Sequence, residues 1–162
     1  MDMAERERGT GARTFLTCAA EVARLVGVEC EFDDDVPELR RGRLLAHAAW
    51  RELLSRPSLP EELFAPLMAA AVYDPDASHC RWYVEPALYV FGRRRVRAAL
   101  LDYLRTGTTA ERKGANRAWY WAGMPLRASR SPAYGPEGVR DPALDASDDL
   151  VHAWLEASEE RP

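Results

Sequence analysis

The sequence predicts an all-α protein built as a short stack of helical hairpins, and three observations support this. Apolar residues recur at helical spacing in one segment after another of the 162-residue chain. Glycines, prolines and capping residues separate these segments at short intervals. A twelve-residue pattern also occurs twice, at 81–92 and 112–123, with Arg, Ala, Tyr and Gly in matching places. A fixed internal period in the thirties is typical of a helical solenoid.

Composition limits the class of protein. Apolar residues make up 47% of the chain and charged residues 30%, with a net charge of −4, which is an ordinary globular balance. A mildly acidic chain is a poor general binder of DNA phosphates. No apolar run is long enough for a membrane span, and the charged N-terminus does not look like a signal peptide. We therefore predict one cytoplasmic domain over residues 1–162, with a flexible tail at 1–12 and no membrane partner.

The first two helices are predicted at about 14–26 and 37–55. Gly27 provides a stop for the first helix. Asp35 is expected to cap the second, with Pro37 in its first turn and Glu38 completing a capping box. We favour this interpretation of the acidic run 33–35 over a metal-binding loop. Three arginines of the second helix are expected to face water: Arg40, Arg41 and Arg43.

The next two helices are predicted at about 58–73 and 77–91. Ser58 is expected to cap the third helix, and Pro66 to bend it or delay its start. The turn Asp74–Asp76 follows, and Asp76 can cap the fourth helix. Pro86 lies inside that helix and predicts a kink.

The last helices are predicted at about 93–105, 109–122 and 147–158. Thr108 and Glu111 form a second capping box before the sixth helix. The stretch 124–145 is rich in Pro and Gly and is predicted to be a long loop.

The second helices of the two hairpins at 58–123 resemble those of HEAT repeats, specifically the short bacterial HEAT-like repeats. In the first copy, the residues that fit the family pattern are Arg81, Ala87, Leu88 and Gly92. In the second copy they are Arg112, Gly114, Ala115, Ala118 and Gly123. The turn Asp74–Asp76 looks like the inter-helix turn of the family. The resemblance implies a short right-handed α-α superhelix of three hairpins plus a C-terminal helix. The chain departs from the family at Trp119, which replaces a Leu, and at Tyr89 and Tyr120, which replace Gly.

In HEAT-like stacks the second helices line the concave side, so aromatic residues on them are candidates for a binding site. The candidate residues for binding a ligand or partner are Arg81, Trp82, Glu85, Tyr89, Arg112, Tyr120 and Trp121. Aromatics together with arginines are typical of protein interfaces. Aromatics at helical spacing are also typical of a core. We assign Trp119 to the core and expect Tyr89 and Tyr120 to be more exposed.

No catalytic motif is present: the chain lacks a phosphate-binding glycine loop, H-E-x-x-H and G-x-S-x-G. The three cysteines form no C-x-x-C pair, which favours buried free thiols. Cys80, beside His79 at a helix start, could alternatively be a reactive thiol. We predict no catalytic residue, no metal and no cofactor.

The function that these patterns favour is a non-enzymatic interaction or scaffold module with a protein or peptide partner. The alternative is a ligand- or nucleic-acid-binding protein. It could then resemble the HEAT-like DNA glycosylases, with Glu85 as a carboxylate and the run Arg93–Arg97 as a basic contact.

Overall fold

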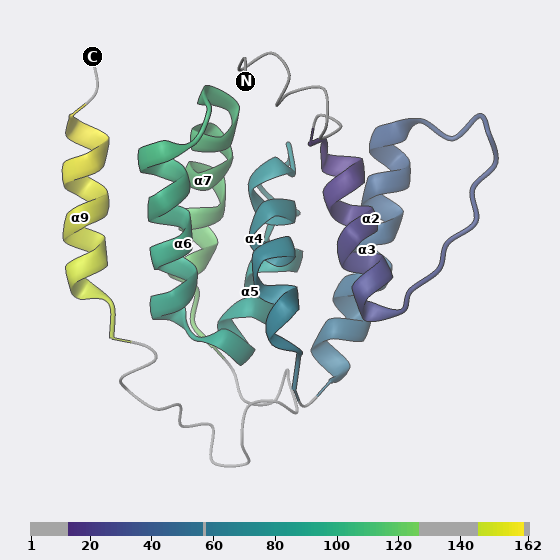
Figure 1. Ribbon diagram of the computed structural model, residues 1–162, viewed down its shortest axis with the longest axis horizontal. Coiled ribbons are helices and arrows are strands. Elements are labelled where there is room, and N and C mark those ends of the chain that lie inside the picture. Colours follow the sequence, from purple (N-terminus) through teal and green to yellow (C-terminus); the bar gives the residue numbers. More distant parts are fainter. Residues whose placement is uncertain (1–12, 57, 127–145, 161–162) are drawn as a thin grey trace, which may run out of the picture.

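The computed structural model describes residues 13–56, 58–126 and 146–160, and most of them lie in helices (Figure 1). The helices are α2 (Phe15–Val26), α3 (Glu38–Ser55), α4 (Phe64–Tyr73), α5 (Arg81–Phe91), α6 (Arg93–Thr106), α7 (Thr109–Ala122) and α9 (Asp148–Glu159). A 3₁₀ turn, η1 (Glu61–Leu63), precedes α4. No strand occurs in these ranges, so the all-α prediction is confirmed. The predicted tail at 1–12 and most of the predicted loop at 124–145 lie outside them.

Consecutive helices pair into three hairpins, α2–α3, α4–α5 and α6–α7, which lie side by side in sequence order (Figure 1). The first helices α2, α4 and α6 form one layer and the second helices α3, α5 and α7 the other. α9 packs against α6 at the end of the row. The central hairpin is covered from both sides, and for this reason its helices are buried over most of their length.

Local sequence signals explain several helix ends. Thr14 accepts the amide of Thr17 at the start of α2, and Gly27 ends that helix with a φ of 80°, which favours glycine. The capping box of Thr108 and Glu111 at the start of α7 is confirmed. Gly92 separates α5 from α6 with a φ of 93°.

The caps predicted for the second, third and fourth helices are wrong. No side chain caps α3, which Pro37 precedes. Arg41 instead donates to the carbonyl oxygens of Asp33, Asp34 and Val36 and holds the preceding segment in place. Arg41 is therefore not simply a solvated side chain.

The cap expected from Ser58 is also absent, because the chain first forms the 3₁₀ turn η1 after Pro60. The α-helix begins only at Phe64, which puts Pro66 in its first turn, where a missing N–H breaks no helical hydrogen bond. Of the two effects predicted for Pro66, a bend or a delayed start, the structure shows the delayed start. The fourth helix starts at Arg81 rather than at 77, and no side chain caps it. Asp76 instead accepts the amides of Ser78 and His79 in the turn that precedes the helix.

The packing of α7 on α4 depends on Gly114. A Cβ atom at this position would lie 1.8 Å from the carbonyl oxygen of Val72, so the two backbones approach too closely for any side chain. Glycine inside a helix costs about 1 kcal/mol relative to alanine. The close approach of the third hairpin to the second is therefore obtained at the expense of local helix stability.

We predict that Gly114→Ala destabilises the protein by about 2 kcal/mol or more, because the added methyl group meets rigid backbone. At an ordinary helix position the same change would stabilise the helix. The measurement is the free energy of unfolding in urea. Asn116→Ala, at an exposed position of the same helix, is the control and should not destabilise the protein, because alanine is the better helix former. Equal effects of the two variants would contradict the prediction.

Candidate functional site

The turn between α4 and α5 is the point where the three hairpins meet. The carboxylate of Asp74 is fully buried and accepts two hydrogen bonds from the guanidinium of Arg43 on α3, at 2.7 and 2.8 Å. It also accepts the amide of Asp76 at 2.9 Å. The backbone oxygen of Asp74 accepts from Arg117 on α7, at 3.0 and 3.3 Å. One turn residue thus binds a helix of each neighbouring hairpin.

Arg43 also orders a cluster of rings on the second-helix layer. Its guanidinium carbon lies 5.7 Å from the centre of the Trp82 ring. Trp82 stacks against Trp50 at 5.8 Å and contacts His47 at 5.3 Å and His79 at 4.7 Å. His47 is exposed and the other three rings are partly exposed. We call His47, Trp50, His79 and Trp82 the aromatic cluster.

The side chain of His79 is oriented by the turn. Its Nδ1 atom lies 3.0 Å from the carboxylate of Asp76. The pKa of Asp76 is lowered, first because the amide of Ser78 donates to the carboxylate and then because of His79. The turn that joins the hairpins therefore also fixes one edge of the aromatic cluster.

Aromatic residues continue from the cluster to α7. The guanidinium of Arg81 lies 5.6 Å from the Trp121 ring, and the indole N–H of Trp121 donates to the oxygen of Ala77 at 2.6 Å. Tyr120 packs edge-on against Trp121 at 5.0 Å and is 75% exposed. We call the cluster together with Arg81, Tyr120 and Trp121 the aromatic face.

Four of the seven predicted site residues belong to this face: Arg81, Trp82, Tyr120 and Trp121. Glu85 and Tyr89 do not, since each is only 1% exposed within α5. The prediction that Tyr89 is exposed is therefore wrong, whereas the same prediction for Tyr120 is confirmed.

Arg112 also lies apart from the aromatic face. It stands at the N-terminal end of α7, where its side chain donates to the oxygen of Gly107. Trp121 is nine positions further along the same helix, which corresponds to about 13 Å along its axis. Arg112 thus stabilises the turn between α6 and α7.

The sequence prediction missed three members of the cluster and the arginine that holds it. Arg43, His47 and Trp50 follow the spacing i, i+4, i+7 and hence share one side of α3, which was the available signal. Trp119, assigned to the core, is partly buried and stacks on Trp154 of α9 at 4.0 Å.

The arginines at the start of α6 bind other parts of the same chain. Arg94 pairs with Asp149 of α9 at 2.7 Å, and Arg95 pairs with Glu61 of η1. Arg93 donates to the carbonyl oxygen of Ala122 at the end of α7. These contacts join α6 to its neighbours, so the three arginines do not form a patch of unpaired cations.

The thiol of Cys80 is buried, and the reactive-thiol alternative is wrong. Burial, together with the nearby carboxylate of Asp74, raises the pKa of Cys80 to about 12. At neutral pH the thiol is therefore protonated. Cys18, Cys30 and Cys80 are all free.

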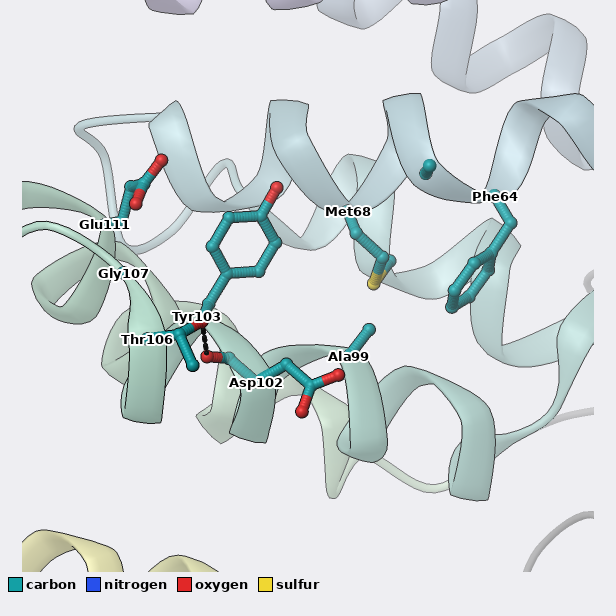
Figure 2. A pocket seen from close by; sticks show the side chains of 9 residues that line it. Phe64, Met68, Ala99, Asp102, Tyr103, Thr106, Gly107 and Glu111 are labelled. Carbon is teal, nitrogen blue, oxygen red and sulfur yellow. Dashed lines mark hydrogen bonds between the residues drawn. The ribbon is translucent and has the colours of Figure 1, made fainter. Parts of the chain in front are cut away.

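A hollow of about 310 Å³ lies on the other layer, between α4 and α6 (Figure 2). Phe64 and Met68 line it from α4, and Asp102 and Tyr103 from α6; Glu111 lies at the end opposite Phe64. A second hollow of about 630 Å³ lies between α2 and α4 and shares Tyr103 with the first.

Glu111 is charged at neutral pH. Burial pushes the pKa of Glu111 upwards, but the amide of Thr108 and the hydroxyl of Tyr73 both donate to its carboxylate and bring the pKa below its usual value. Burial and the hydrogen bond to Glu111 raise the pKa of Tyr73 to about 12.

Comparison of the chain with protein-family models, curated proteins and solved structures finds no significant match. The site is therefore interpreted from its own geometry. Within the described ranges, no group of three His, Cys, Asp or Glu side chains is placed to hold a metal ion. None of the helices in these ranges combines the length and apolar character that crossing a membrane requires.

We predict that Asp74→Asn destabilises the protein by about 3 kcal/mol, because it leaves the partly buried guanidinium of Arg43 without its counter-charge. The free energy of urea unfolding measures this effect. Asp35→Asn removes an exposed carboxylate as the control and should cost less than about 0.5 kcal/mol. A similar cost for both variants would show that the turn does not hold the hairpins together.

We predict that Tyr73→Phe costs about 1 kcal/mol and raises the pKa of Glu111, since one hydrogen bond to its carboxylate is lost. A lowered carboxyl pKa gives stability that is present above pH 4.5 and is lost as the pH falls through the folded-state value. The variant should therefore lose less stability in acid than the wild type. The variant should also lose less stability than the wild type between pH 10 and 12. In the wild type, the raised pKa of Tyr73 favours ionisation of the unfolded state over the folded state in this range.

The pKa of Glu111 is followed by carboxyl-carbon NMR, and the unfolding free energy by urea titration at each pH. Tyr120→Phe changes an exposed tyrosine and is the control. An unchanged Glu111 pKa in Tyr73→Phe would refute the assigned role of the hydroxyl.

Proposed function

We propose that the protein is a non-enzymatic binding module that holds a protein or peptide partner against the aromatic face. The observation that carries this proposal is the ring cluster of α3 and α5, in which mutually stacked rings remain partly open to solvent. Tryptophan, tyrosine and arginine dominate the binding energy of protein interfaces because they combine large apolar area with polar groups.

The distribution of exposed apolar side chains also points to the layer of second helices as the binding surface. Among the described residues, three of the four large apolar side chains that are exposed belong to second helices: Leu39, Leu44 and Tyr120. The fourth is Leu155 on α9. Partner side chains that cover rings in this layer would remove apolar surface from water.

The partner is expected to combine apolar side chains with a carboxylate. Arg81 makes a cation–π contact with Trp121, but it is in no ion pair with a described residue. Arg43 and Arg117, by contrast, are held by Asp74. A carboxylate that binds Arg81 while apolar groups cover Trp82 and Tyr120 would satisfy both parts of the face.

We also propose that the three hairpins form a HEAT-like superhelix. Two observations support this: the second helices repeat at a fixed offset in the sequence, and the turn at Asp74 binds both neighbouring hairpins. No observation on the described residues favours the nucleic-acid alternative. Glu85 is buried, and Arg94 and Arg95 are paired within the molecule.

We predict that peptides selected from a random display library on the full-length protein lose at least tenfold in affinity when Tyr120 and His47 are both changed to Ala. Loss of one or more aromatic contact residues at a hot spot typically costs more than 1 kcal/mol, and tenfold corresponds to about 1.4 kcal/mol. Both side chains are exposed, so folding should be preserved. Affinity is measured by fluorescence anisotropy and folding by circular dichroism.

Leu155→Ala is the matched control, because it removes an exposed apolar side chain of α9 that is outside the aromatic face. Trp82→Phe tests the centre of the cluster while preserving a ring. Selection of no binding peptide, or peptides whose affinity depends on Leu155 and not on Tyr120 and His47, would refute the proposal.

A further inference from the structure

The hollow between α4 and α6 combines an apolar trough with negative charge. Figure 2 shows Met68 and the Tyr103 ring along the trough, with Phe64 and Glu111 at its two ends and Asp102 at its edge. Both charged residues that line it, Asp102 and Glu111, are carboxylates. The trough therefore has one sign of charge and an aromatic wall.

The two carboxylates differ in the partners that they already have within the molecule. Glu111 accepts hydrogen bonds from the amide of Thr108 and from the hydroxyl of Tyr73, both at 2.8 Å. Asp102 is exposed, and no described cation forms an ion pair with its carboxylate. Arg13 approaches Tyr103 and is itself in the second hollow. Asp102 is thus the group in the trough that is open to a new counter-charge.

The molecule already uses the same combination of groups at the Phe64 end. Arg95 lies over the Phe64 ring, 4.0 Å from its centre, and pairs with Glu61. An aromatic ring and a carboxylate there hold a guanidinium of the chain itself. Tyr103 and Asp102 present a ring and a carboxylate in the same hollow. The hydroxyl of Tyr103 is hydrogen-bonded to Arg13, but no described cation forms an ion pair with the carboxylate of Asp102.

We propose that this hollow is a second binding site, separate from the aromatic face, that takes an arginine side chain of a peptide or protein partner. The apolar stem of the arginine would lie over Ala99 and Tyr103, and its guanidinium would bind Asp102. A volume of about 310 Å³ is at the lower limit for small-molecule sites, which favours one anchoring side chain over a larger ligand.

The neighbouring hollow provides a path for the rest of the partner. It shares Ala65 and Tyr103 with the first and continues over Pro66 and Ala69 towards α2. The small side chains of α4 leave room for an extended peptide to cross this helix. The site lies on the first-helix layer, so it does not depend on the function proposed for the second helices.

The test uses fluorescein-labelled Leu-Arg-Ala-Leu-Arg-Leu-amide as the probe, and the same peptide with citrulline in place of both arginines as its uncharged control. Binding to the full-length protein is measured by anisotropy, and contacts are mapped from the amide NMR spectrum. We expect the arginine peptide to bind at least fivefold more tightly than the citrulline peptide. We also expect it to shift the amide signals of Met68, Ala99 and Tyr103.

Asp102→Asn should weaken binding of the arginine peptide at least fivefold, whereas Asp148→Asn, which removes an exposed carboxylate of α9, should change it less than twofold. Neither carboxylate holds another described side chain, so both variants should fold. Absence of binding at millimolar peptide, equal affinity for the citrulline peptide, or equal effects of the two variants would overturn the inference. Signal shifts confined to Trp82 and Tyr120 would overturn it while supporting the aromatic face.

Discussion

The ion pair between the buried carboxylate of Asp74 and the partly buried guanidinium of Arg43 is the interaction on which the rest of the structure depends. A buried carboxylate is costly unless its oxygens are paired, and here the guanidinium of Arg43 and the amide of Asp76 provide the partners. The pair fixes α3 against the turn of the central hairpin, and Arg117 fixes α7 to the backbone of the same residue. The relative positions of the three hairpins are therefore set by groups that converge on one turn.

The same turn connects packing to the candidate binding surface. Arg43 reaches from Asp74 to the ring of Trp82, and Asp76 contacts His79 at the edge of the cluster. Trp121 then binds the oxygen of Ala77, just beyond the turn. Because the rings are attached to a rigid structural element, a partner would bind them with little loss of conformational freedom. The hollow at Asp102 is on the other layer, and the two surfaces can be tested independently.

Much of the helical structure could be predicted from local patterns. The helix of residues 109–122 follows from the Thr108–Glu111 capping box, and the end of the first helix from Gly27. The failures occurred where one local interaction replaced another. Arg41 holds the segment before the helix that Asp35 was expected to cap, and the η1 turn precedes the helix that Ser58 was expected to start. A capping motif that spans three residues does not reveal these alternatives.

The sequence by itself determined the all-α class, the approximate helix positions and the presence of aromatic residues on the second helices, because these follow from periodicity and capping within short windows. Only the tertiary structure decided which aromatics remain exposed. Tyr89 and Tyr120 occupy equivalent places in the repeat, yet Tyr89 is buried and Tyr120 is open. The physical reason is position in the stack: α5 lies between α3 and α7, whereas α7 has no following second helix among the described residues to cover it.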